Sequence, residues 1–137
     1  MLRGCSVMEI KIDEDIGLLL AHPTGVFDMK LAEEILHFIE VWEVVRQEGF
    51  NRYCDLTGLD SIRLSASEIR QISMRRRMFN PNQVPVRTAF LADTPIAFAT
   101  VAIYQDLLNS PRITVRAFRN IAEASGWLRI EPRKLRG

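Results

Sequence analysis

The sequence contains only two cysteines in 137 residues, Cys5 and Cys54. Two thiols cannot build the disulfide framework of a small secreted domain, and they favour a reducing compartment. The first residues lack the apolar stretch that a secretory signal needs. The apolar run at 16–21 is far too short to span a bilayer. We therefore expect a cytoplasmic protein with no integral membrane association.

Closely spaced glycines and histidines are also lacking. The seven glycines lie too far apart to form a phosphate-binding loop. The two histidines and two cysteines show no zinc-ligand spacing, so we expect neither a metal nor a cofactor. Cys54 lies in an apolar segment, where a buried, unreactive thiol is more common than a nucleophile. The net charge of +1 gives no general attraction to nucleic acid.

The length of 137 residues and the hydrophobic content of 47% are typical of one globular domain. We expect this domain at 8–129, with flexible tails at 1–7 and 130–137. Charge is uneven along the chain, because residues 1–60 carry 12 acidic and 5 basic side chains, whereas residues 61–137 carry 5 acidic and 13 basic ones. This asymmetry is compatible with a homodimer held by complementary charges, and equally with two solvated surfaces.

The pattern of apolar residues predicts an alternation of strands and helices. Strands are expected at 8–12, 16–27, 50–56, 86–93 and 112–118, and helices at 29–48, 65–79, 95–108 and about 120–128. Residues 57–64 are expected to form a loop. After an opening hairpin, strands that alternate with helices require parallel pairing. The predicted fold is therefore α/β, with a five-stranded, mostly parallel mixed sheet and about four helices.

Charged residues on the first two helices are assigned to solvent. Helical spacing predicts that the first helix buries one apolar stripe: Leu31, Ile35, Phe38, Trp42 and Val45. Glu40 and Glu43 then belong to its solvated side. The run Arg75–Arg77 ends the second helix, where it complements the helix dipole. Contact of these arginines with an anionic partner is the alternative interpretation.

Three aspartates lie at the end of a predicted strand or a few residues after it. Asp55 and Asp93 end strands, and Asp60 lies in the predicted loop. The carboxyl ends of parallel strands are where ligands bind in open α/β sheets, so these carboxylates are candidates for a cation or acid–base site. Capping of turns and helices is the more frequent use of aspartate there, and we favour it. Ser65 and Glu68 similarly match the capping box of a helix start.

The third predicted helix carries no charge from Pro95 to Gln105. A helix that is apolar nearly all round is buried on more than one side. Three explanations stay open: burial within the chain, contact with a second copy of the chain, or the lining of a pocket for an apolar ligand, in which Thr100 and Tyr104 would be the polar groups. The candidate residues for such a ligand or dimer surface are Phe98, Val101, Tyr104 and Leu108.

The segment DLTGLDSI, residues 55–62, is similar to the strand-to-loop motif of STAS domains, which reads roughly Asp-Leu-Ser-Gly-Val. In the anti-sigma-factor antagonists of this group, an Asp-Ser pair comes next, and phosphorylation of that serine prevents kinase binding. Here a gapless match places Arg63 and Leu64 at those two positions, with Ser65 one residue late. The resemblance therefore implies an SpoIIAA-like fold without the classical phosphorylation switch.

The segment VRAFRNIAEASGWL, residues 115–128, resembles the last strand and helix of uncharacterised SpoIIAA-like proteins, a group related in fold to lipid-binding CRAL-TRIO domains. The resemblance implies a non-enzymatic regulatory or protein-interaction module. Its candidate partner-facing residues are Asp55, Thr57, Asp60, Ser61 and Ser65. The alternative is a binder or carrier of a small apolar or lipid-like ligand. A third hypothesis, an enzyme that uses the strand-end aspartates, is the weakest.

Overall fold

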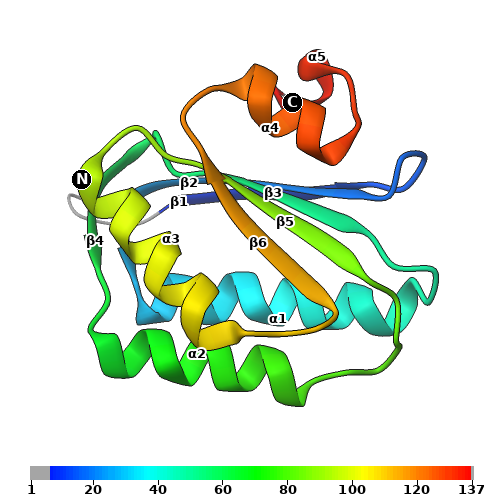
Figure 1. The fold of residues 1–137 in the computed structure, drawn as a ribbon, viewed down its shortest axis with the longest axis horizontal. Helices are drawn as coiled ribbons and strands as arrows, with labels where there is room; N and C mark the ends of the chain where they lie inside the picture. Colours follow the sequence, from blue (N-terminus) through cyan, green and yellow to red (C-terminus); the bar gives the residue numbers. More distant parts are fainter. Residues whose placement is uncertain (1–6, 137) are drawn as a thin grey trace.

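A central sheet with helices on both faces makes up the protein (Figure 1). The structure, a computed structural model, describes residues 7–136. The strands are β1 Val7–Asp13, β2 Leu18–Asp28, β3 Asn51–Asp55, β4 Leu59–Arg63, β5 Val86–Leu91 and β6 Ile113–Phe118. The helices are α1 Met29–Val45, α2 Ala66–Met78, α3 Pro95–Leu108, α4 Ile121–Leu128 and α5 Pro132–Leu135. Cys5 and the expected tail at 1–7, apart from Val7, lie outside the described residues.

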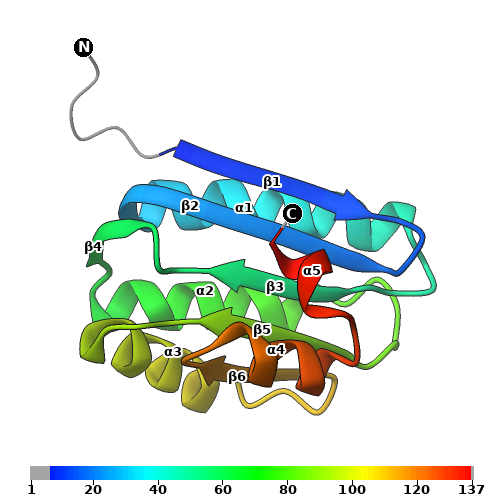
Figure 2. The same cartoon turned by 90° about the horizontal axis from the view of Figure 1, so that it is seen from above.

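The sheet is mixed and mostly parallel. Its main path runs β1-β2-β3-β5-β6, and β1 is antiparallel to β2 while the later pairs are parallel (Figure 2). The helices α1, α2 and α3 cover one face, and α4 and α5 cover the other (Figure 1). The predicted α/β class, opening hairpin and parallel sheet are therefore confirmed.

The structure adds a sixth strand, β4, where the sequence predicts a loop. The end of β2 extends past β3 and pairs with β4 instead, in parallel, over 25–28. The register shifts between Gly25 and Val26, and Gly25 has a φ of 84°, a conformation that favours glycine. Asp60, near the middle of this strand, has weak strand propensity. This strand forms because the exposed backbone of β2 requires hydrogen-bond partners.

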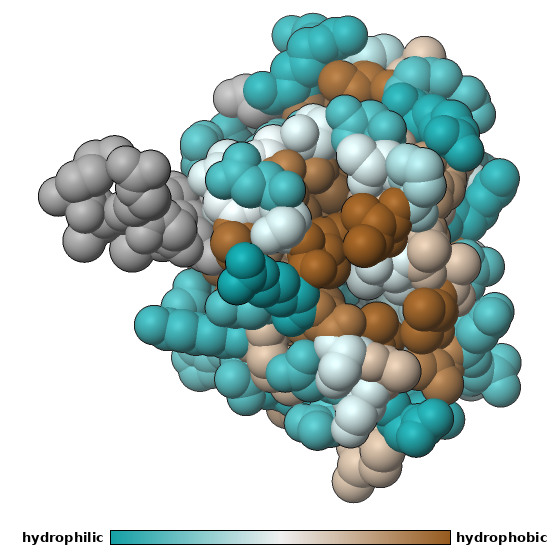
Figure 3. Space-filling model, turned by 90° about the vertical axis from the view of Figure 1, so that its left-hand side faces the viewer, coloured by the Kyte–Doolittle hydropathy of each residue, from teal (hydrophilic) through white to brown (hydrophobic). Residues whose placement is uncertain are grey.

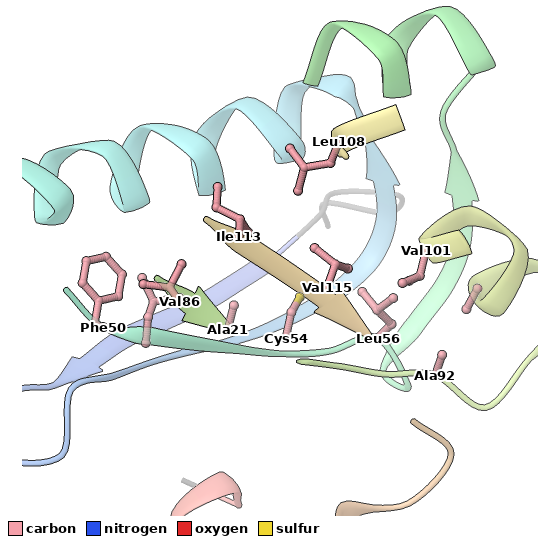
Figure 4. Packing of buried hydrophobic residues seen from close by; sticks show 12 residues of the cluster. Ala21, Phe50, Cys54, Leu56, Val86, Ala92, Val101, Leu108, Ile113 and Val115 are labelled. Carbon is pink, nitrogen blue, oxygen red and sulfur yellow. The ribbon is translucent and has the colours of Figure 1, made fainter. Parts of the chain in front are cut away.

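Apolar side chains fill both sides of the sheet. Leu19, Ala21 and Cys54 pack toward α1 and α3, in the cluster shown in Figure 4. The alternate residues Leu18 and Leu20 belong to a second cluster, on the side that α4 and α5 cover. Because neighbouring residues of a strand point to opposite faces, a strand covered on both sides must be continuously apolar. That requirement explains the uninterrupted LLLA of β2.

The C-terminal segment differs from the flexible tail expected at 130–137. Residues 132–135 form α5, and Leu135 is buried in the cluster that contains Leu18 and Leu128. Burial of Leu135 contributes roughly 1.5–3 kcal/mol to holding this short helix against the sheet.

The start of α2 has the predicted cap. The Ser65 Oγ accepts a hydrogen bond from the Glu68 backbone N–H at 3.1 Å, and the Glu68 carboxylate accepts one from the Ser65 N–H at 2.9 Å. We expect Ser65→Ala to lower the free energy of unfolding by about 0.5–2 kcal/mol. Urea denaturation measures this loss. Ser67→Ala, the same change at an exposed position without a capping bond, is the control, and equal effects of the two variants would contradict the assignment.

Candidate functional site

The five candidate partner-facing residues lie in the strand-to-loop region and at the start of α2. Asp55 and Thr57 form a local turn, in which the Asp55 Oδ1 accepts from the Thr57 N–H at 2.9 Å and from its hydroxyl at 2.6 Å. Asp60 and Ser61 belong to β4, and Ser65 is the cap of α2. Asp55 and Ser65 thus both have local structural partners.

The four candidate residues of α3 do not share one surface. Val101 and Leu108 are buried core residues of the single chain. Tyr104 is half-buried with its ring against Phe90, and Phe98 is half-buried under the guanidinium of Arg119 at 4.2 Å. The outward face of the helix carries four other apolar residues, Ile96, Ala99, Ala102 and Ile103, and its last turns also expose Gln105 and Asp106.

A cavity of about 110 Å³ lies between the sheet and the three helices α1, α2 and α3. Its walls are almost entirely apolar, and representative side chains are Leu19, Leu36, Ile69 and Val101. Val101 and Tyr104 are the members of the α3 set that reach it. Val101 is therefore buried within the chain and also lines a cavity, so two of the three explanations for α3 apply to it.

Several lining residues lie at the edge of the molecule near β4. Phe27, Ile62 and Leu64 line the cavity and are only half-buried. Figure 3 shows apolar side chains gathered on this side, where β4 and the first turns of α2 and α3 lie in Figure 1. Part of the cavity wall is therefore accessible to solvent along β4.

A buried cluster of charges stands beside the cavity. The carboxylate of Glu43, on α1, accepts two hydrogen bonds from Arg76 on α2, at 2.7 and 3.0 Å. It also accepts one from Arg52 on β3, at 2.6 Å. Arg112, just before β6, has its Nη1 at 3.7 Å from the same carboxylate. Arg52 and Arg76 line the cavity.

The charges in this cluster do not balance. Among the described residues, Glu43 is the only carboxylate within ion-pair distance of Arg52, Arg76 and Arg112. Three guanidinium groups therefore share one carboxylate. Glu43, Arg52 and Arg76 are each no more than 3% exposed, so water screens the excess positive charge very little.

Arg52 is the least satisfied member of the cluster. Its Nη2 donates to Glu43, but its Nε has no hydrogen-bond partner, one of two such buried side-chain atoms in the described part of the chain. Burial, followed by repulsion from Arg76, lowers the pKa of Arg52 to about 10. Burial also raises the pKa of Tyr104, although the positive charges of Arg76 and Arg52 act to lower it. The phenol of Tyr104 thus lies within the electrostatic reach of both arginines.

Burial alone would raise the pKa of Glu43. Its hydrogen bonds and charge attraction to Arg76 and Arg52 outweigh that effect and hold the pKa below its ordinary value. Glu43 therefore stays ionised, and its role in the cluster is that of a fixed counter-ion. General acid catalysis would instead require a raised pKa.

Three sequence-based assignments in this region are wrong. Glu43 is buried, although it is predicted on the solvated side of its helix, and Val45 is 64% exposed, although it is predicted in the buried stripe. Arg76 is 2% exposed rather than part of a solvated helix end. Helical spacing indicates the burial of Glu43 and Arg76, because each lies on the buried stripe of its helix. The stripe on α1 contains Ala32, Leu36 and Glu43, and the stripe on α2 contains Ile69, Ile72 and Arg76.

The strand-end aspartates form no metal centre. Within residues 7–136, no three histidine, cysteine, aspartate or glutamate side chains gather in a way that could hold an ion. No helix in the same range has the length and apolar character needed to cross a membrane. The site that stands out is therefore the apolar cavity with its arginine-rich end.

Comparison with solved structures shows the fold. An uncharacterised protein of the DUF3478 family from Shewanella loihica PV-4, described as having an SpoIIAA-like fold, superposes with a TM-score of 0.58 and 14% identity. The match covers 90% of this chain and 93% of that chain. No protein-family model and no curated protein matches the sequence. The chain therefore has an SpoIIAA-like fold, as its sequence resemblance implies.

Removing the counter-ion tests the electrostatic description. We expect Glu43→Gln to cost about 3–5 kcal/mol of stability, because it leaves the buried guanidinium groups of Arg52 and Arg76, and the half-buried one of Arg112, without a carboxylate. Glu40→Gln is the matched control one turn away. Glu40 pairs with Arg75 at 2.7 Å, but the Arg75 side chain is 38% exposed, so this loss should not exceed about 1 kcal/mol. Equal losses in urea denaturation would contradict the charge cluster.

Proposed function

We propose that the chain is a non-catalytic binding module that holds a small apolar ligand in the cavity between the sheet and α1, α2 and α3. The observation that carries this proposal is the cavity itself, with about 110 Å³ of space and walls of aliphatic and aromatic side chains. Protein interiors are normally packed without such voids. An unfilled cavity costs stability, because its walls lose packing contacts.

The size of the cavity limits the ligand. It is somewhat smaller than the engineered apolar cavity of about 150 Å³ that binds benzene in another protein. A short branched chain or one small ring fits this space, whereas a long acyl chain would have to extend out of it. The half-buried residues Phe27, Ile62 and Leu64 provide the candidate entrance.

Ser65 has no switching role in this function. Its oxygen already accepts the capping hydrogen bond from the Glu68 backbone N–H. The STAS resemblance requires an Asp-Ser pair at positions 63 and 64, and this chain has Arg63 and Leu64 there.

Cys54 is a buried thiol without a disulfide, which fits the reducing environment of the cytoplasm. Burial raises the pKa of Cys54, which keeps the thiol protonated and unreactive.

A neutral probe tests the proposal. Benzene should raise the melting temperature of the wild-type protein in a concentration-dependent way, because a ligand that binds the folded state stabilises it. Thr100→Phe places a ring at a half-buried lining position of α3, and it should abolish the benzene effect. Ala102→Phe, on the exposed face of the same helix, should retain it. No stabilisation of the wild-type protein by benzene would contradict the function.

A second candidate function is binding to another copy of the chain. Ile96 is 61% exposed and Ile103 is 41% exposed on the outward face of α3, where Ala99 and Ala102 lie between them. The acidic first half and the basic second half of the sequence supply complementary charge for such a pairing. An apolar patch on a helix is a common feature of interaction sites.

Light scattering tests this second candidate. The wild-type protein should show a mass that rises with concentration toward that of a dimer, and Ile96→Lys should shift it toward the monomer. Val44→Lys, at a 52% exposed position on α1, is the control and should leave the mass unchanged. A monomer at every concentration would remove dimerisation as a function of this face.

A further inference from the structure

The apolar cavity has one polar end, and that end is positively charged. Among the described residues, Arg52 and Arg76 are the only charged ones in the lining of the cavity. The other lining residues are mostly apolar, and four of them carry a hydroxyl group: Tyr53, Thr88, Thr100 and Tyr104. Both arginines are almost fully buried, with exposed fractions of 3% and 2%. A neutral hydrocarbon would fill the apolar part of this space and leave the arginine end unused.

The hydrogen bonds of the two arginines show which donor is available. Arg76 uses both terminal nitrogens on Glu43, at 2.7 and 3.0 Å. Arg52 uses only Nη2, at 2.6 Å, and its Nε is unpartnered. A buried donor without a partner is destabilising. An acceptor that enters from the cavity would satisfy it.

The charge of the cluster shows what kind of acceptor fits. Glu43 neutralises one of the three guanidinium groups contributed by Arg52, Arg76 and Arg112, so an excess of positive charge remains. Arg52 and Arg76 are almost fully buried and Arg112 is half-buried, so water screens this excess poorly. A neutral acceptor would satisfy the Arg52 Nε but leave that excess. An anion would do both, and a carboxylate pairs especially well with a guanidinium group.

We propose that the ligand is a small apolar carboxylic acid in its ionised form, with its carboxylate on the Nε of Arg52 and its apolar body among Leu19, Leu36 and Val101. This inference rests on the proposed function and narrows it to one chemical class. Small aromatic acids and short branched aliphatic acids have the required size. Arg76 and Arg112 contribute charge attraction, and Glu43 holds Arg52 and Arg76 in place.

An isosteric pair of ligands separates the charge from the apolar body. Benzoate and benzamide have the same ring and nearly the same shape, but only benzoate is charged. Isothermal titration of the wild-type protein should show benzoate binding at least about tenfold more tightly than benzamide, as expected for a charge-assisted hydrogen bond. A ratio near one in the wild-type protein would overturn the inference.

Variants of Arg52 on β3 and Arg75 on α2 test which arginine causes the preference for benzoate. In Arg52→Met, the dissociation constants of benzoate and benzamide should lie within about threefold of each other. Arg75→Met is the matched control, because Arg75 pairs with Glu40 and does not line the cavity. This variant should keep the preference for benzoate. Loss of the preference in Arg75→Met, or its retention in Arg52→Met, would overturn the assignment.

A measurement on the wild-type protein covers the case in which Arg52→Met does not fold. In a ¹⁵N NMR spectrum, benzoate should shift the Nε–H resonance of Arg52 and slow its exchange with water, whereas benzamide should do so much less. An Arg52 Nε–H that does not respond to saturating benzoate would overturn the inference.

If benzene stabilises the protein but benzoate does not bind more tightly than benzamide, the proposed binding function stands and only the assignment of a carboxylate is wrong. If benzene fails as well, the function itself is contradicted.

Discussion

The buried carboxylate of Glu43 joins four segments of the chain. It lies on α1 and contacts Arg76 on α2, Arg52 on β3 and, at 3.7 Å, Arg112 before β6. Burying these groups is costly unless each is paired. The cluster therefore ties α1 and α2 to the sheet at one end, while apolar packing holds them elsewhere. The cavity lies beside this charged end and takes its polarity from it.

The excess of positive charge is the constraint that connects the fold to the proposed ligand. A balanced ion pair would be a structural feature with no implication for binding. Here one carboxylate serves three guanidinium groups, and the Nε of Arg52 has no partner. An unpaired charge in a medium of low dielectric constant is expensive. An SpoIIAA-like fold alone would not indicate this chemistry, because function depends on the site that a fold carries.

The sequence predicts the fold well, because strong local signals agree with the tertiary structure. The LLLA run, the capping box at Ser65 and the alternation of strands with helices each correspond to an observed element. β4 is missed because it is short, contains the weak strand former Asp60, and pairs only with the overhang of β2. Glu43 and Arg76 are missed for a different reason. Both fall on the buried stripes of their helices, but charged residues are normally exposed. Their burial depends on the pairing of Glu43 with Arg76, which is 33 residues away in the sequence.

The most direct test of the central claim is a crystal structure of the wild-type protein with 4-bromobenzoate, whose bromine marks the ring by anomalous scattering. The account predicts the ring within the cavity between the sheet and α1, α2 and α3, and a carboxylate oxygen within hydrogen-bond distance of the Arg52 Nε. Bromine on the protein surface, or a carboxylate directed away from the arginines, would contradict it.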